Sequence, residues 1–271
     1  MNHHKNPLRY SIHSRLRAHH LARMIGNSKH GRFLDVGCGL GFLTEVLGSG
    51  FHCRLGLEYD MASVAANAKR SIHGMVQGDA ARLPYQDSCV DVIVCSELLE
   101  HLPDGQDAKA LAEMARVLKP GGRLLITVPS MEGLRATSRL RNLGHDDPNG
   151  GEYHYRQGYA WPDIQRMIQS VEGLQIRTRR YSMFLFAELC MDLLKLVYFR
   201  NNNLKEHADI MNMKSGFIYI LYKMLFPVMF GVFLLEDSLC CPIFAGHILI
   251  LDLTKSLSVN NTNPPQSNDS R

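Results

Sequence analysis

One short run constrains this chain more than any other: an apolar strand that breaks into a glycine turn and then opens a helix. The run Phe33–Gly41 reads FLDVGCGLG, with glycines at positions 37, 39 and 41. Glycine tolerates positive φ and has no Cβ to obstruct a ligand that approaches the backbone. A helix beginning near Leu40 would present unpaired N–H groups to that ligand. The sequence therefore predicts a ligand-binding turn here.

The spacing of the glycines argues against one common interpretation of such a turn. A dinucleotide-binding fingerprint needs its third glycine at position 42, where this chain has Phe42. That glycine allows the helix and the strand to pack closely around a pyrophosphate. Phe42 therefore disfavours a nicotinamide-dependent dehydrogenase.

Apolar runs alternate with helical patterns along most of the chain. Predicted strands span residues 32–36, 53–58, 74–77, 90–95, 122–129 and 174–181, and predicted helices include 111–118 and 162–169. This alternation favours an α/β fold with a parallel sheet covered by helices on both faces. Residues 246–253 form the last predicted strand, which we expect to be an antiparallel edge strand.

Five segments resemble, in order, the motifs of the class I S-adenosylmethionine (SAM) methyltransferases. They are Phe33–Gly41, Gly56–Asp60, Gln77–Pro84, Asp91–Leu102 and Ala115–Leu124. Five motifs in the family's order are far more specific than one. The resemblance implies a Rossmann-like fold, in which a seven-stranded, mostly parallel sheet ends in an antiparallel last strand. In this chain an apolar helical insertion would precede that strand.

The resemblance also assigns residues to SAM. Glu58 would hold both ribose hydroxyls, Asp79 would accept from the adenine amino group beside the N–H of Ala80, and Asp35 would orient the glycine loop. Structural alternatives stay open: Glu58 or Asp60 could supply a helix N-terminal charge, Asp79 could be a turn residue, and Asp35 could be merely buried. The full predicted set for S-adenosyl-L-methionine is Asp35, Gly37, Cys38, Gly39, Gly41, Glu58, Tyr59, Asp79, Ala80 and Ser96.

Catalysis of methyl transfer requires the nucleophile, the methyl group and the sulfur to be aligned. A general base helps where the acceptor is a hydroxyl or an acidic carbon. We predict His101, His154 and Glu100 as catalytic residues, with Glu97 and Tyr155 as further candidates for the base. His154 lies in a segment similar to the H-x-R-x-Y/F element of many small-molecule methyltransferases, which covers their substrate pocket.

The segment Glu97–His101 has the pattern E-x-x-E-H, which is similar to the divalent-metal segment of ubiquinone-pathway and small-RNA O-methyltransferases. Two carboxylates and an imidazole could bind Mg²⁺ or a softer ion. The alternative is an acid that caps a helix and a histidine that packs or relays a proton. A divalent metal is therefore a secondary expectation, and no residue is assigned as its ligand.

We expect five regions along the chain. Residues 1–30 form a basic N-terminal helical arm, 31–182 the SAM-binding core, 183–245 an apolar helical insertion or cap, 246–255 the final strand of the core, and 256–271 a disordered tail. Three interpretations of the insertion stay open: a cap on the core, a membrane-surface element, or a lining for a greasy substrate. Its uncharged run 224–235 is short for a membrane span.

Charge and cysteine content suggest where the protein works. The net charge of the 271 residues is +4, yet no acidic residue precedes Asp35, so the N-terminal arm is basic. Such an arm could touch anionic lipid or nucleic acid, although we favour a helix packed on the sheet through Ile12, Leu16, Leu21 and Met24. The seven cysteines show no CxxC spacing and no apolar signal segment is present, which predicts reduced thiols and a cytoplasmic protein.

These observations predict a SAM-dependent methyltransferase that acts on a small lipid-like or isoprenoid acceptor, with O-methylation favoured and peripheral membrane contact as a further expectation. Alternatives are a soluble or carbohydrate acceptor, transfer to carbon, or a non-catalytic SAM-binding or scaffold protein. Nucleic acid is a disfavoured partner, because the chain has no Asn/Asp-Pro-Pro-Tyr/Phe element and no broad basic stripe beyond the arm.

Overall fold

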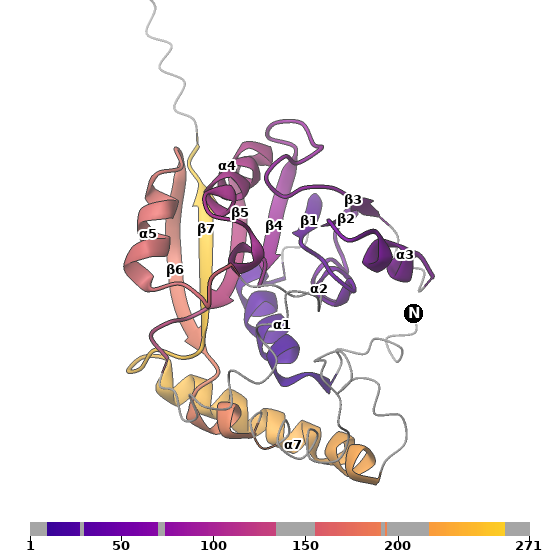
Figure 1. Cartoon of the computed structure of the whole chain (residues 1–271), viewed down its shortest axis with the longest axis vertical. Coiled ribbons are helices and arrows are strands. Elements are labelled where there is room, and N and C mark those ends of the chain that lie inside the picture. The colour runs from indigo at the N-terminus through magenta and orange to yellow at the C-terminus, as the bar shows by residue number, and fades with distance from the viewer. Residues whose placement is uncertain are drawn as a thin grey trace, which may run out of the picture.

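Seven strands form one sheet with helices on both faces (Figure 1). The structure is a computed structural model that describes residues 10–27, 30–69, 74–133, 155–190, 193 and 217–257. The strands are β1 (Arg32–Val36), β2 (Cys53–Glu58), β3 (Met75–Gln77), β4 (Val90–Ser96), β5 (Leu118–Pro129), β6 (Leu174–Ser182) and β7 (Ile248–Lys255). The helices are α1 (Ile12–Ile25), α2 (Phe42–Leu47), α3 (Met61–Lys69), η3 (Leu99–His101, a 3₁₀ turn), α4 (Gln106–Val117), α5 (Trp161–Gln169) and α7 (Phe217–Cys240).

The strand order is β3-β2-β1-β4-β5-β7-β6. β1 lies between β2 and β4 and pairs with both in parallel, so Val36 stands opposite Leu57 on one side and Cys95 on the other. β7 is antiparallel to both of its neighbours. The predicted fold class, a mostly parallel seven-stranded sheet with an antiparallel last strand, is confirmed.

One detail of that prediction is wrong: β7 is not an edge strand. It pairs with β5 on one side and with β6 on the other, and β6 forms the edge. The first six residues of β7 are all buried. A strand that is apolar on both faces suits an interior position, where neighbours and helices hide it from water.

Alternation along the strands builds a core on each face of the sheet. Phe33 faces one cluster, and its neighbour Leu34 faces the other. The Leu34 cluster packs against α4 and α5, which contribute Leu111 and Ile164. The Phe33 cluster packs against α1, α2 and α7. The sheet is therefore the middle of three layers, as a doubly covered parallel sheet requires.

The expected packing of the N-terminal helix on the sheet is also confirmed. Ile12, Leu16 and Leu21 are fully buried in the Phe33 cluster, and Met24 packs against it. Ser11 caps the helix by accepting from the N–H of Ser14 at 3.3 Å. This apolar stripe holds α1 across the sheet near the ends of β1 and β4.

α7 crosses the end of the molecule toward which β4 and β6 point (Figure 1). The buried Asp237 of α7 anchors it there, accepting from Ser182 Oγ at 2.5 Å and from the N–H of Met183 at 3.0 Å. His20 of α1 bonds the same carboxylate at 2.7 Å. A buried carboxylate with three partners therefore ties α1, the end of β6 and α7 together.

Much of the expected insertion and the tail from residue 258 lie outside the described residues, so the five-region division stays a prediction. All seven cysteines are described and none forms a disulfide, with Cys38 and Cys95 buried. In the part of the chain that the structure describes, no helix is both long enough and apolar enough to cross a membrane.

Candidate functional site

The predicted glycine turn leaves β1 and lies against the end of β2. The N–H groups of Gly37 and Cys38 both donate to the carbonyl of Leu57, at 2.8 and 3.0 Å. Gly37, Gly39 and Gly41 all have positive φ, which explains the need for glycine. A Cβ on Gly37 would lie 2.9 Å from Leu98, whereas one on Gly39 would meet nothing within 4 Å. Gly39 therefore faces open space that a ligand could fill.

Two side chains hold the Gly39 peptide from opposite sides. Its N–H donates to Glu58 Oε2 at 2.7 Å, and its carbonyl accepts from Asn67 Nδ2 of α3 at 2.7 Å. Asn67 is fully buried, and its Oδ1 has no hydrogen-bond partner among the described residues. The loop is thus fixed before any ligand arrives, and a buried acceptor atom is left beside it.

Glu58 and Asp60 divide the two roles that the sequence left open. Asp60 caps α3, accepting from the N–H groups of Ala62 and Ser63 at 3.2 and 2.9 Å and from Ser63 Oγ at 2.8 Å. These bonds lower the pKa of Asp60. Glu58 instead accepts from Gly39 and from the N–H groups after β2. The carboxylate of Glu58 is therefore directed at the glycine loop and is not used to cap the helix.

Asp35 lies beneath the loop and is fully buried. Thr44 Oγ1 donates to its Oδ2 at 2.5 Å. Burial raises the pKa of Asp35 to about 7, and the hydrogen bonds from Thr44 oppose that rise. Burial likewise raises the pKa of the Cys38 thiol, which keeps it neutral. Asp35 is thus tied to α2, the helix that follows the glycine loop.

The loop after β3 brings Asp79 and Ala80 beside the end of β2. Gly78 donates to the carbonyl of Glu58 at 3.0 Å, and Tyr59, next in sequence, is largely exposed. Asp79 accepts from the N–H of Ala81 at 2.8 Å, so it does make the local turn. The Asp79 side chain is otherwise exposed. The pairing of Glu58 with Gln77 places the end of β3, and the loop that follows it, beside the end of β2.

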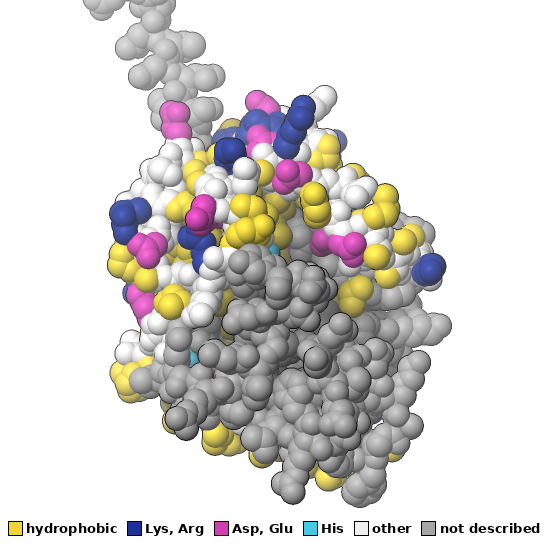
Figure 2. Space-filling view, viewed as in Figure 1, with side chains coloured by type: hydrophobic (Ala, Val, Ile, Leu, Met, Phe, Trp, Pro, Cys, Tyr) yellow, Lys and Arg dark blue, Asp and Glu magenta, His cyan; other side chains and the backbone are white. Residues whose placement is uncertain are grey.

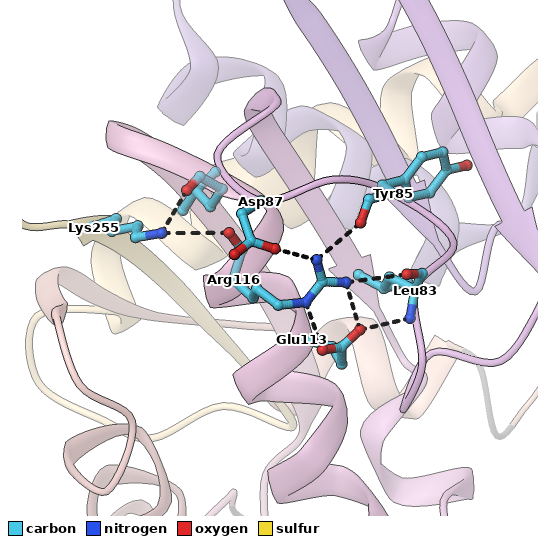
Figure 3. A network of polar contacts seen from close by, with 7 residues as sticks. Leu83, Tyr85, Asp87, Glu113, Arg116 and Lys255 are labelled. Atoms are coloured by element: carbon cyan, nitrogen blue, oxygen red, sulfur yellow. Dashed lines mark hydrogen bonds and ion pairs between the residues drawn. The ribbon is translucent and has the colours of Figure 1, made fainter.

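A cluster around Arg116 of α4 fixes the far end of this loop (Figure 3). Arg116 donates to the carbonyls of Leu83 and Tyr85 at 3.1 and 2.9 Å and binds Glu113 and Asp87. Glu113 also accepts from the N–H of Leu83 at 2.8 Å. The hydrogen bond from Arg116 lowers the pKa of Glu113. Arg116 therefore holds the loop that carries Asp79 without itself reaching the glycine turn.

The end of β4 forms the second half of the site. Ser96 Oγ and Thr127 Oγ1 lie 2.7 Å apart, and Thr127 donates to Glu97 Oε1 at 3.1 Å. Glu97 Oε2 lies 3.5 Å from the guanidinium of Arg17 on α1. Glu97 has a φ of 53°, an uncommon conformation for a residue other than glycine. A polar chain thus runs from β5 through β4 to α1, and a strained residue lies in it.

Glu100 and Arg17 are ionisable groups beside this chain, the first buried and the second half-buried. Glu100 is 1% exposed, and its Oε2 has no partner among the described residues. Burial raises the pKa of Glu100 to about 7. Burial lowers the pKa of Arg17 to about 10, while the charges of Glu100 and Asp35 oppose the change. Its Nε also lacks a partner in the described part of the chain. A shielded ionisable group without a hydrogen-bond partner costs folding free energy, and a ligand that supplied the missing partner would reduce that cost.

The other predicted catalytic residues are placed less closely. His101 ends η3 and is half-buried, whereas Tyr155 is exposed. Arg156 donates its N–H to the carbonyl of Glu100 at 3.2 Å and pairs with Asp107 at 3.2 Å, which brings its segment over η3. His154 lies outside the described residues.

The metal expectation does not fit this geometry. Within the described residues, no group of three His, Cys, Asp or Glu side chains could hold a metal ion. Glu97 faces Arg17 and Thr127, and Glu100 is buried beside the same guanidinium. In the E-x-x-E-H segment, Glu97 is therefore the acid in a salt bridge and Glu100 is the buried acid. The segment forms a 3₁₀ turn, η3, and not a regular α-helix that would bring the two carboxylates together.

Sequence reasoning missed two residues that the site contains. Asn67 is a polar residue between alanines in α3, a signal that could have marked it as buried and hydrogen-bonded. Arg17 lies four positions before the buried Leu21, so it falls on the apolar stripe of α1. A charged residue on an apolar face is unusual enough to predict a function. Both approach the site from helices that pack onto it.

The fold and the loop geometry define a class of protein: a doubly covered α/β sheet that binds a ligand at the carboxyl ends of its central strands. Comparison with known proteins narrows this class. Residues 34–126 match the family model described as "Methyltransferase domain". A demethylmenaquinone methyltransferase of Deinococcus radiodurans is 32% identical over 170 residues, covering 55% of this chain and 68% of that protein. One of Mycolicibacterium paratuberculosis is 32% identical over 155 residues, covering 52% and 66%.

Solved structures agree on the fold. Phosphoethanolamine N-methyltransferase 2 of Haemonchus contortus, solved with S-adenosyl-L-methionine, gives a TM-score of 0.54 at 16% identity, covering 89% of this chain and 52% of that one. A SAM-dependent methyltransferase of Thermotoga maritima, described as a possible histamine N-methyltransferase, gives 0.54 at 17%, covering 92% and 91%. At these identities the likeness concerns the fold alone.

The chain belongs to the class I SAM-dependent methyltransferases. It spans about two thirds of the length of the two demethylmenaquinone methyltransferases compared above. The resemblance stated from the five motifs is thereby confirmed.

Proposed function

We propose that this chain transfers a methyl group from SAM to an oxygen of a small, quinone-like lipid acceptor. The observation that carries the SAM half is the glycine loop, whose Gly39 peptide is fixed by Glu58 and Asn67 and faces open space. The names of the relatives, demethylmenaquinone methyltransferases, support a quinone-like acceptor. Transfer to carbon or to a soluble acceptor is the alternative that experiment must separate.

The residues present fit SAM. The carboxylate of Glu58 can accept from both ribose hydroxyls, and Asp79 with the N–H of Ala80 can bind the adenine edge. Arg17 is half-buried and its Nε has no partner among the described residues, which suits the carboxylate of the amino acid part. Asp35 would orient the glycine loop through its bond to Thr44 of α2. When bound, SAM supplies a methyl group activated by the positive sulfur.

Glu100 is our proposed general base. Its pKa of about 7 is close to neutral pH, where a base both exists in the ionised form and can still take up a proton. Its Oε2 is buried and has no hydrogen-bond partner among the described residues, so the oxygen is not committed to another group there. Glu100 would accept the proton that the acceptor hydroxyl loses as the carbon–oxygen bond forms. Arg17, whose charge opposes the rise in the pKa of Glu100, would stabilise the ionised form between turnovers.

His101 and His154 remain proposed positioning or proton-transfer residues at the acceptor side. His101 directly follows Glu100 in η3, and His154 precedes the segment that bonds to Glu100 through Arg156. An imidazole can donate or accept near neutral pH, so either residue could orient an acceptor oxygen. We also propose peripheral membrane contact, since a quinone-like lipid resides in a bilayer.

The test begins with cofactor binding and then asks for the acceptor. Calorimetry with SAM and with NAD should show binding of SAM alone. Labelled SAM is then incubated with a total lipid extract, an aqueous metabolite extract and two probes: a hydroxynaphthoquinone, which can accept at oxygen, and a demethylated naphthoquinone without a hydroxyl, which can accept only at carbon. Label in the lipid extract and the hydroxynaphthoquinone is expected, and it should fall sharply in Glu100→Gln while SAM binding persists. Label in the demethylated naphthoquinone alone would mean that the methyl group goes to carbon. Label confined to the aqueous extract would contradict the lipid acceptor, and absence of SAM binding would contradict the whole proposal.

A further inference from the structure

The outer face of α7 carries a continuous stripe of exposed apolar side chains. The stripe consists of Ile220, Met224, Val228, Val232, Leu235 and Leu239, each 42% to 72% exposed. Their spacing of three and four residues places them along one side of the helix. In Figure 2 the described side chains visible along the lower edge, where Figure 1 places α7, are hydrophobic. A face of this extent must be covered in the working protein.

A second helical segment extends this face. Residues 185–190 are helical and lie beside α7, because the N–H groups of Phe186 and Ala187 donate to Glu236 at 2.6 and 3.0 Å. The rings of Phe186 and Phe233 are 5.7 Å apart. Leu185 and Leu189 of this segment are each 51% exposed. The apolar surface is therefore wider than one helix.

The charges of α7 select the kind of partner. The helix has three charged residues, Lys223, Glu236 and Asp237. Asp237 is 2% exposed and binds β6 and α1, so it is hidden from a partner. Glu236 is half-buried and accepts hydrogen bonds from the neighbouring helical segment. The six residues of the stripe are themselves uncharged, and the engagement of Glu236 in these bonds limits its repulsion of an anionic surface.

The helix that flanks α7 adds positive charge. α1 contains no acidic residue, and its Arg15 guanidinium lies over the ring of Phe230 at 5.3 Å. Tyr222 Oη donates to the carbonyl of Tyr10 at 2.5 Å, which holds the two segments together. An apolar stripe beside a helix that carries cations and no acid is consistent with a helix that lies in the surface of an anionic bilayer.

We infer that the stripe of α7 and the helical residues 185–190 dock this chain on an anionic lipid bilayer. This face lies at the end of the sheet toward which the parallel strands point, the same end as Gly39 and Glu100. Docking would therefore place the acceptor side of the site close to the membrane. The proposed function enters this inference in one respect: it supplies the reason for docking, which is access to a lipid acceptor.

The test measures binding of the full chain to vesicles by co-sedimentation. Vesicles of phosphatidylcholine are compared with vesicles that also contain phosphatidylglycerol, and binding is expected to be stronger to the second. The double variant Val228→Gln, Leu235→Gln removes two exposed side chains of the stripe and should weaken binding about tenfold or more. Leu257→Gln is the matched control, because Leu257 is 72% exposed beyond the opposite end of β7 and should not change binding.

Three results would overturn the inference. The first is equal binding by the double variant and the wild type. The second is absence of vesicle binding together with a wild-type dimer that the double variant loses, which would make a second copy the occupant. The third is absence of vesicle binding by a monomer, which would leave the face to another part of the chain. Calorimetry with SAM on each preparation keeps a failure of cofactor binding distinct from all three.

Discussion

The glycine loop and the end of β4 lie at the same edge of the sheet but satisfy their polar groups differently. In the loop, both sides of the Gly39 peptide are hydrogen-bonded, and the unpartnered atom nearby is a neutral amide oxygen, Oδ1 of Asn67. At the end of β4, the atoms without described partners belong to ionisable groups, Arg17 and Glu100, and Glu97 is strained. The loop keeps a fixed shape because side chains complete the hydrogen bonds of its backbone, whereas the ionisable groups at the end of β4 are left incompletely paired.

The largest effect on SAM affinity should come from Glu58, whose carboxylate binds the glycine loop. Glu58→Ala removes an ionised acceptor from Gly39 and from the proposed ribose site, so SAM affinity should fall by several hundredfold or more, since hydrogen bonds to charged groups are worth ~1.5–3 kcal/mol each. Calorimetry measures this. Asp60→Asn, which can still cap α3, is the control and should keep SAM affinity within about twofold. Unchanged affinity in Glu58→Ala would mean that the loop is not a cofactor site.

The next effect concerns the pH dependence of stability on the β4 side. The pKa of Glu100 is about 7 in the folded protein against an ordinary value of 4.5, so between these pH values the folded state holds the extra proton. The free energy of unfolding must therefore fall as pH rises through this window, and the loss is complete above pH 7. At ~1.4 kcal/mol per pKa unit, the contribution of Glu100 amounts to ~3 kcal/mol.

Glu100→Gln isolates that contribution, because Asp35 titrates in the same direction and remains in both proteins. Urea unfolding at pH 5 and pH 8 should show a smaller loss of stability in the variant, which should be the more stable protein at pH 8. Equal slopes in the two proteins would mean that Glu100 is solvated, and the contrast between the two halves of the site would weaken.

A smaller effect should distinguish the half-buried Arg17 from the exposed Arg23 on the same helix. Arg17→Met keeps the apolar stem but removes the proposed partner of the SAM carboxylate, so SAM affinity should fall about thirtyfold. Arg23→Met, at an exposed position of α1, should leave affinity within about twofold. Equal small effects of both substitutions would show that Arg17 serves only Glu97 and Glu100.

The smallest change in stability is expected at the open glycine. Gly39→Ala forces alanine to a φ of 48° and should cost ~1–2 kcal/mol, but its methyl group would occupy the space proposed for SAM. Gly105→Ala is a matched control, since Gly105 is left-handed with a φ of 78° and also meets nothing within 4 Å. Both should lose similar stability in thermal unfolding, whereas SAM affinity should fall about tenfold in Gly39→Ala alone. Parallel behaviour would argue that Gly39 faces only water.

Much of the fold was predictable because its signals are local. β1 and β2 begin and end where the apolar runs predicted, and α5 begins one residue earlier than expected. β5 begins at Leu118, four residues before its predicted start, because the chain passes through Gly121 and Gly122 and still pairs with β4 across a register shift. The interior place of β7 depends on its pairing with β6, a contact between distant segments that no local pattern encodes.

The residues of the site also fall into two groups, those that the local sequence revealed and those that only tertiary packing brought in. Glycine spacing and the motifs located the loop, Glu58 and Asp79, since a backbone that needs positive φ records that need in its own residues. Asn67 and Arg17 became part of the site through the packing of α3 and α1, and the pKa values of Asp35 and Glu100 follow from burial. Local conformation is determined by neighbours in the chain. Burial, and with it the charge state of a carboxyl group, is determined by whatever the tertiary structure places against it.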